Sequence, residues 1–340
     1  MATQLKTIKA SGIDYSTWSS WEDAAAISST TTDPWHGAQD AFDASQLKFG
    51  TWADPPTAEA HRVKCYAAAG QGHGGGWSSG ATIVNASWAC VWSGAVSFVT
   101  IDGLRLQNTR ASSTGEGVLI NSTCSGWRVR NCLIEATNAG NGNGGVYVQA
   151  GSGETIDDLI VENCVLRGAN DGIYISTLSG ANPFVITVRN CTVYDKAVFG
   201  VYVSATTATT TTVTLQNVLA LTGAADYLWS GVVDTSTYQN LVSDDSTADN
   251  SGGTGHQVDQ VIADVWTNAA GGDFTLPVTS NAVGAGVSIA GLTHDILGRP
   301  RRGRPYDVGA YAFPRHLANS AGRQGRTRRP AQHYAKGPTA

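Results

Sequence analysis

The residues best suited to catalysis lie near the middle of the chain. Asp171, Asp195 and Lys196 combine two carboxylates with an amine, and Glu135 and Arg167 precede them. Two carboxylates roughly 5 to 9.5 Å apart would suit glycoside hydrolysis, whereas a lysine or arginine beside metal-binding carboxylates would suit a polysaccharide lyase. These residues are the candidates for a catalytic site.

The same candidates also have a structural interpretation. Asp171 directly precedes Gly172 and a strand-like segment, and Asp195 lies in the turn-like sequence Tyr194-Asp-Lys. Aspartate is common at such positions because its side chain bonds to nearby backbone groups. We therefore assign no catalytic residue and keep Asp171, Asp195 and Lys196 as the alternative.

The elements that would position these residues are two recurring sequence patterns. One pattern ends at Gly103, Asn131, Asn163, Asn190 and Asn217, and the other begins at Gly117, Gly145, Gly172 and Gly200. The first returns every 27 or 28 residues, apart from one interval of 32 that contains the polar insertion 137–145. A fixed period of this size is typical of repeat architectures.

Each pattern alternates apolar and polar residues and is rich in Val, Ile, Thr and Tyr, which indicates short strands. A repeat of two or three strands cannot enclose a core alone, so successive repeats must stack about 4.8 Å apart. The sequence therefore predicts an all-β solenoid, a single-stranded parallel β-helix. Residues 60–313 leave room for roughly nine coils.

Stacking converts equivalent positions into columns of like side chains. The predicted structural columns are Asn131, Asn163, Asn190 and Asn217; Cys132, Cys164 and Cys191; and Tyr147, Tyr174 and Tyr202. Asparagine suits a corner with left-handed backbone, and its amide can bond along the axis. The tyrosines either pack as a ladder or form an exposed platform for sugar rings.

Composition gives no sign of a metal or another cofactor. None of the six cysteines forms a Cys-x-x-Cys pair, and parallel stacking favours free thiols over disulfides. The acidic, glycine-rich stretch 243–255 reads as a loop and lacks the regular ligand spacing of a calcium motif. We predict no cofactor and no metal, and a chain made in a reducing cytoplasm.

Three regions are predicted. Residues 1–60 form an N-terminal cap with one helix at 19–27, residues 61–313 form the rod, and residues 314–340 form a basic tail that is extended or disordered unless bound. Trp18 and Trp21 either form an aromatic core under the cap or contact a partner.

Charge is unevenly distributed along the chain. Residues 1–298 hold 12 basic and 26 acidic side chains, whereas residues 299–340 hold ten basic side chains and one acid. The tail suits an acidic partner, which we expect to be a protein or a second copy rather than nucleic acid. The expected partner-binding residues of the tail are Arg315, Arg323, Arg326, Arg328, Arg329 and Lys336.

Two segments carry a resemblance to a known family. Asp295-Ile-Leu-Gly-Arg-Pro-Arg301 followed by Pro305-Tyr-Asp-Val-Gly-Ala-Tyr311 is similar to the closing motif of right-handed parallel β-helix repeat proteins with a pectate-lyase-like fold. The opening stretch, residues 7–22, resembles the start of such proteins from tailed bacteriophages. The resemblance covers residues 1–313 and implies a right-handed β-helix.

The resemblance leaves activity open, because this fold carries enzymes and inert virion parts alike. The paired aspartates of polygalacturonase-like enzymes and the acidic calcium cluster of pectate lyases are missing. We therefore predict a non-catalytic virion protein, a capsid decoration or fibre-like component docked on other virion proteins through the rod end or the tail. The alternative is a polysaccharide lyase, a glycoside hydrolase or a tailspike that binds host-surface polysaccharide. The resemblance implies a location in the virion. No signal peptide or membrane span is predicted, so we expect synthesis in the host cytoplasm.

Overall fold

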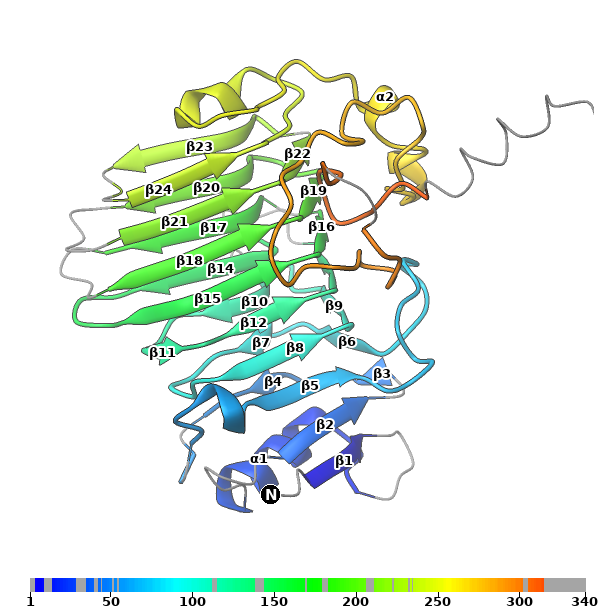
Figure 1. Ribbon diagram of the computed structural model, residues 1–340. Coiled ribbons are helices and arrows are strands. Elements are labelled where there is room, and N and C mark those ends of the chain that lie inside the picture. The colour runs from blue at the N-terminus through cyan, green and yellow to red at the C-terminus, as the bar shows by residue number, and fades with distance from the viewer. Residues whose placement is uncertain are drawn as a thin grey trace, which may run out of the picture.

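The chain folds into a parallel β-helix, which confirms the predicted fold class. The computed structural model describes residues 4–8, 14–28, 35–39, 42–43, 45–50, 52–53, 55–111, 115–137, 144–168, 170–178, 183–205, 211–221, 223–231, 233, 235–301 and 305–314. Within these residues, three parallel sheets run the length of a rod (Figure 1). Most of the polar insertion and all of the tail beyond Pro314 lie outside the described residues.

Most coils contribute one short strand to each of the three sheets. Sheet A contains β1 (Gln4–Ile8), β2 (Trp35–Gln39), β5 (Val63–Ala67), β8 (Val99–Asp102), β12 (Arg128–Arg130), β15 (Ile156–Glu162), β18 (Phe184–Arg189), β21 (Thr211–Gln216) and β24 (Thr235–Gln239), and β11 (Cys124–Ser125) pairs with β15. Sheet B contains β3 (Phe42–Asp43), β6 (Thr82–Asn85), β9 (Arg105–Asn108), β13 (Leu133–Ala136), β16 (Val165–Arg167), β19 (Thr192–Tyr194) and β22 (Leu219–Leu221). Sheet C contains β4 (Leu47–Lys48), β7 (Ala89–Trp92), β10 (Glu116–Ile120), β14 (Val146–Ala150), β17 (Asp171–Thr177), β20 (Phe199–Ala205) and β23 (Ala225–Gly231).

The core is a stack of aliphatic side chains that point into the rod. Pairing places Ile186 beside Val213 on sheet A and Ile173 beside Val201 on sheet C, and all four are fully buried. Burial of this kind contributes about 1.5 to 3 kcal/mol per side chain. Because every coil buries its apolar residues only against its neighbours, the repeats must stack to be stable.

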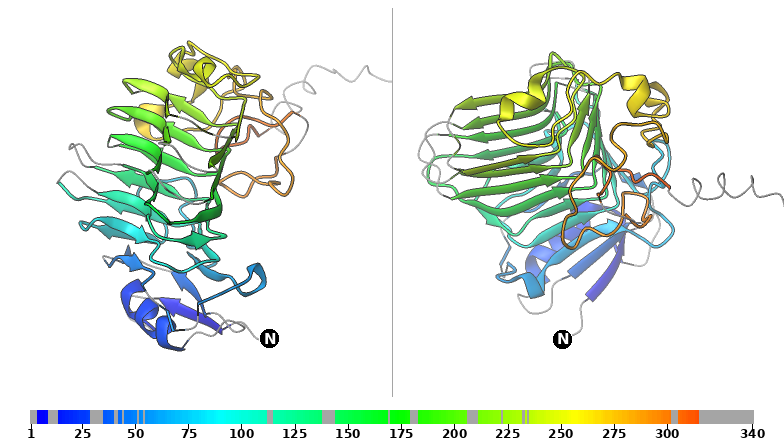
Figure 2. Two further views of the ribbon diagram at one scale, coloured as in Figure 1. Left: turned by 90° about the vertical axis from the view of Figure 1, so that its left-hand side faces the viewer. Right: turned by 45° about the horizontal axis from the view of Figure 1, so that its top comes forward.

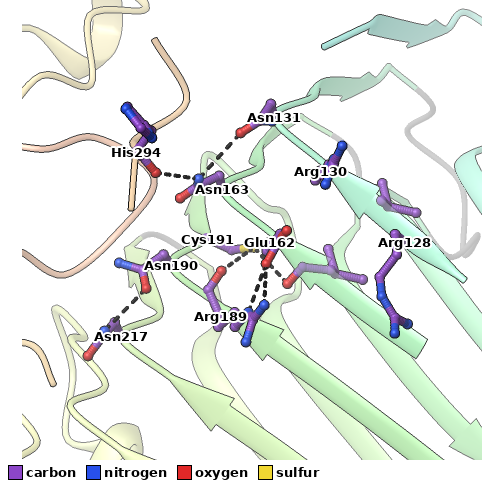
Figure 3. Close-up of polar contacts among 12 residues, drawn as sticks. Arg128, Arg130, Asn131, Glu162, Asn163, Arg189, Asn190, Cys191, Asn217 and His294 are labelled. Atoms are coloured by element: carbon purple, nitrogen blue, oxygen red, sulfur yellow. Dashed lines mark hydrogen bonds and ion pairs between the residues drawn. The ribbon is translucent and has the colours of Figure 1, made fainter. Parts of the chain in front are cut away.

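The chain turns from sheet A to sheet B through the predicted asparagine column. Asn131, Asn163, Asn190 and Asn217 all have φ between 49° and 54°, in the left-handed region, and Gly103 has the same conformation at 70°. Asn163 Nδ2 donates to Asn131 Oδ1 at 3.3 Å, and Asn217 Nδ2 donates to Asn190 Oδ1 at 3.2 Å (Figure 3). The structure adds a fifth member that sequence reasoning missed, Asn240 at 53°.

The N-terminal end is closed by helix α1 (Trp18–Ser28), as predicted, and the short 3-10 helix η1 (Glu59–His61) follows the cap. Trp18, Trp21 and Ala25 of α1 are fully buried in one apolar cluster with Leu47 and Phe49. Ser19 and Glu22 have the spacing of a capping box, but they do not cap this helix. Thr17 is the capping residue, its Oγ1 accepting from the Ser20 N–H at 3.1 Å, whereas Glu22 Oε1 accepts from Trp52 Nε1 at 2.8 Å.

The predicted rod of nine coils over residues 61–313 needs correction at both ends. β1 to β4 precede residue 61 yet belong to the three sheets, and the last parallel bridges are Gln239 with Thr254 and Val242 with Gln257. Within the described residues, sheets B and C hold seven strands each, which gives about seven complete coils. The stack ends there because 3-10 helix η2 (Thr247–Ser251), predicted as a loop, packs on β23.

Residues 258–301 and 305–313 form a strap that returns along the outside of sheet B rather than adding coils. The strap begins with α2 (Ile262–Val265) and η3 (Ala269–Gly271) and then runs beside β22, β19 and β16 (Figures 1 and 2). It forms a second apolar core with outward-facing residues of sheet B, including Leu133, Val165 and Leu219. None of the described helices is long and apolar enough to cross a membrane.

The closing motif holds this strap against the asparagine column. Arg301, only 7% exposed, donates through Nη2 to Asn163 Oδ1 at 2.8 Å and to Gly309 O at 2.9 Å. Asn190 Nδ2 donates to Asp307 O and Gly309 O, and Asn217 Nδ2 donates to Val287 O. The motif is therefore a lock between the strap and the corner of the rod.

Substitution of Asn217 separates its backbone role from its amide bonds. Asn217→Gly keeps the left-handed conformation but loses the bonds to Asn190 and Val287, and we expect the free energy of unfolding to fall by about 2 kcal/mol. Asn217→Ala adds the strain of a left-handed alanine and should cost about 1 kcal/mol more. Chemical denaturation measures both, and equal losses would contradict the backbone role.

Candidate functional site

The structure brings Asp171 and Lys196 together but buries both. Asp171 is 7% exposed at the start of β17, and Lys196 is 4% exposed in the turn after β19. Lys196 Nζ donates to Gly168 O, and Asp171 Oδ1 accepts from the Phe199 N–H at 3.2 Å. Asp195 is exposed at a left-handed turn position with φ 55°.

Burial controls the protonation of this pair. Removal from water lowers the pKa of Lys196 to about 7, although Asp171 and Asp195 favour its charge. Burial also raises the pKa of Asp171 to about 6, against the Phe199 N–H and Lys196, which lower it. Neither group reaches the surface, so the pair stabilises the turns and is not placed to act on a polymer.

Glu135 and Arg167 form an ion pair at the edge of an open groove. Arg167 Nη2 lies 2.8 Å from Glu135 Oε1, and the guanidinium lies 3.9 Å from the centre of the Trp77 ring. The groove encloses about 650 Å³ between the 74–78 loop and strap residues 271–275. Its lining includes Asp273 and Tyr311, but the Asp273 carboxylate accepts from the Thr275 N–H and hydroxyl.

This groove does not present the pair of accessible carboxylates that glycoside hydrolysis needs. Glu135 is tied to Arg167 and also lies 3.7 Å from Arg105 Nη2. Asp273 holds its own turn, as described above. The candidates from the sequence are thus close in space. Asp171, Lys196 and Glu135 are, however, already bonded to other groups of the protein.

The described residues also lack a metal centre. No three His, Cys, Asp or Glu side chains among them converge to hold a metal ion. The acidic stretch 243–255 instead closes the rod end, where Asp245 Oδ1 accepts from the Thr247 N–H at 2.8 Å and Asp226 Oδ2 accepts from the Asp244 N–H at 2.7 Å. Burial, together with Asp244, raises the pKa of Asp226 to about 9.

The tyrosine column packs against itself. Tyr147 pairs with Tyr174 and Tyr174 with Tyr202, with ring centres 5.0 and 4.6 Å apart and planes within 13° of parallel. The ring faces that a sugar would need are occupied by neighbouring tyrosines. The geometry favours the packing interpretation over the sugar platform.

The cysteine column is a row of buried free thiols. All six cysteines are free and buried. Cys164 Sγ lies 3.3 Å from Glu162 O and 3.6 Å from Val129 O, so the thiols bond to carbonyl groups of their own and the preceding coil. Burial raises the pKa of the Cys164 thiol well above its usual range.

The predicted partner-binding residues divide into two groups. Trp18 and Trp21 are fully buried and pack edge to face at 5.4 Å, so they are core residues and cannot contact a partner. The six basic residues of the tail, Arg315 to Lys336, lie outside the described residues. Their role stays a prediction.

Sequence reasoning missed a small pocket on sheet C. Gln46, Trp88, Trp92, Leu119 and Asn121 line a cavity of about 160 Å³. Trp88 is 63% exposed, whereas Trp92 donates through Nε1 to Asn121 Oδ1 at 2.6 Å. The repeat pattern gave no signal for this pocket because only Trp92 and Leu119 lie in a recurring column, that of the tyrosines, whereas Gln46, Trp88 and Asn121 lie outside the strands.

The chain belongs to the family defined by the right-handed beta helix region, whose model matches residues 73–242. No curated protein matches the sequence. Solved structures similar to it include a pectin methylesterase from Aspergillus niger in deglycosylated form, with 12% identity, a TM-score of 0.42, and 69% of this chain and 87% of that chain covered. Pectate lyase Pel9A is also similar, with 12% identity, a TM-score of 0.42, and 92% and 97% of the two chains covered.

Lys196→Met should remove a pH dependence of stability. Because the folded pKa of Lys196 is about 7 and its usual value is 10.5, the unfolded chain binds more protons between these values, so stability rises with pH across that window, by up to roughly 1.4 kcal/mol per pH unit. The unfolding free energy of the wild type should therefore rise relative to that of Lys196→Met between pH 7 and pH 10. Parallel curves would show that the lysine is not desolvated, and Lys64→Met serves as the control.

The thiols should resist modification in the folded protein. Because all six are buried, none should react with Ellman's reagent at pH 8 in the folded protein, and all six should react in denaturant. Rapid reaction of any cysteine in the native state would show that its coil opens.

Proposed function

We propose that this chain is a non-catalytic structural rod of a bacteriophage particle, either a capsid decoration or a fibre-like accessory component. The observation that carries the proposal is the strap lock, in which the buried Arg301 joins Asn163 to Gly309. The lock fixes the strap against the corner of the rod. The residues of the closing motif, by which the sequence resembles β-helix repeat proteins, therefore serve the stability of the rod.

Two further features support a structural role. Sheet A carries a column of alternating charge in which Arg130 Nε lies 2.9 Å from Asp102 Oδ2 and Arg189 Nη2 lies 2.6 Å from Glu162 Oε2 (Figure 3 shows the second pair). Such cross-strand pairs stabilise neighbouring coils. Covers at both ends of the stack, α1 and η2, protect strand edges that would otherwise pair with other chains.

The polysaccharide-degrading alternative has weaker support. Asp171 and Lys196 are buried, and each bonds to a backbone group of the neighbouring coil. The proposed attachment of the rod to other virion proteins uses the basic tail, whose arginines would meet an acidic protein surface.

Particle composition tests this proposal. Purified particles should contain the protein in a fixed copy number, and deletion of residues 314–340 should release it. Replacement of the six basic tail residues by glutamine should have the same effect, because attachment depends on charge, whereas Arg128→Gln and Arg130→Gln on the rod should leave it bound.

Two results would contradict the proposal. Absence of the protein from particles would exclude the virion role, and retention after deletion would exclude docking through the tail. Release of reducing ends or unsaturated uronates from a polysaccharide would establish the enzymatic alternative instead.

A further inference from the structure

We propose that His73 makes the loop of residues 68–81 sensitive to pH: neutral His73 holds this loop against the rod and the strap, and protonated His73 releases it. The loop joins β5 to β6 at the corner between sheets A and B, where the next coil turns within residues 103–104. It projects outward beside the strap (Figures 1 and 2). The inference does not rest on the proposed virion role.

Both ring nitrogens of His73 are hydrogen-bonded, which fixes one neutral tautomer. Nε2 lies 2.7 Å from Asn131 O, a group that can only accept, so Nε2 carries the proton. Nδ1 accepts from the Gly75 N–H at 2.9 Å and therefore carries none. The side chain is only 3% exposed. The ring thus ties the tip of the loop to the corner of the second coil further along the rod.

The tip of the loop packs directly on the strap. A Cβ at Gly75, where φ is 82°, would lie 2.8 Å from Leu297 Cδ2 and 3.3 Å from Tyr311 Oη, so glycine allows this contact. Two grooves border the loop: the one of about 650 Å³ described above, which Gly75 lines, and a second of about 360 Å³, which Gly72 lines. Both also border strap residues 295–298. Release of the loop would therefore join the two grooves into one.

Protonation of His73 removes the bond that holds the tip. A second proton on the imidazole would lie on Nδ1 and face the Gly75 N–H, so that two donors would meet. The loop itself offers no countercharge, because His73 is the one ionisable side chain in residues 68–81.

The carboxylates on the elements around the loop are already bonded. Ion pairs join Asp102 of the corner to Arg130 at 2.9 Å, Asp295 of the strap to Arg299 at 2.7 Å, and Glu135 of sheet B to Arg167 at 2.8 Å. The Asp273 carboxylate of the strap accepts from the Thr275 N–H and hydroxyl. The other titratable side chains along the two grooves are Tyr66, His294 and Tyr311.

The closed loop is therefore favoured at neutral pH and disfavoured in acid. Burial, the largest influence, lowers the pKa of His73 from its ordinary 6.5, although Asn131 O and Asp102 raise it. An open loop exposes the imidazole, so the open state binds more protons than the closed state once the pH falls below about 6.5. At pH 5, about 1.5 units lower, opening becomes easier by up to about 30-fold.

Hydrogen exchange at pH 7.5 and pH 5, corrected for the intrinsic pH dependence of exchange, tests the proposal. The Gly75 and Gly76 amides bond to Nδ1 and to the carbonyl oxygen of His73. They should lose about 10- to 30-fold of their protection at pH 5, while β17 stays protected. Nitrogen chemical shifts of His73 should show an unprotonated Nδ1 at pH 7.5.

Two variants assign the response to His73. His73→Gln cannot take up a proton, so the protection of its loop should be the same at both pH values. His256→Gln is the matched control. His256 Nδ1 also accepts from a backbone N–H, that of Leu241 at 3.1 Å, but it lies near the other end of the rod. This variant should keep the wild-type response of the loop.

Equal protection of the wild-type loop at both pH values would overturn the proposal. So would a wild-type response in His73→Gln, or a protonated Nδ1 at pH 7.5. An equal loss of protection in β17 at pH 5 would also overturn it, because acid would then unfold the rod as a whole instead of releasing the loop.

Discussion

The left-handed corner between sheets A and B is the constraint on which the rest of the structure depends. Most coils bend from their sheet A strand to their sheet B strand within about two residues, and asparagine or glycine adopts the required φ at low cost. Asn131, Asn163, Asn190, Asn217 and Asn240 provide that turn. Because the amides project from the corner, they also bond along the axis and to the strap.

The strap extends the effect of this corner to the whole rod. Arg301 enters the column at Asn163 and also bonds to the backbone at Gly309 and Ala310. A Cβ at Gly309, where φ is 90°, would lie 2.7 Å from Thr192 Oγ1, so only glycine allows the strap to approach sheet B this closely. The bond between Arg301 and Asn163 joins residues 138 positions apart, and the strap covers the outer face of sheet B.

The repeated half of the fold could be predicted from the sequence, and the rest could not, for physical reasons. Equal spacing fixes the columns of Asn, Cys and Tyr, because stacking depends only on neighbouring coils. Asn240 was missed because its coil is shorter, and the strap was missed because contacts such as Arg301 with Asn163 carry no period. Register brought Asp171 and Lys196 together as expected, but their burial depends on side chains from several coils. The same holds for the pocket at Trp88 and Trp92.

Hydrogen exchange in Asn190→Gly tests most directly whether the corner holds the strap. This variant keeps a residue that tolerates the left-handed turn but loses the amide that donates to Asp307 O and Gly309 O. The account predicts faster exchange in residues 305–312, including the Gly309 and Ala310 amides that bond to Asn217 O and Thr192 Oγ1, while β17 stays protected. Unchanged exchange in residues 305–312 would contradict it.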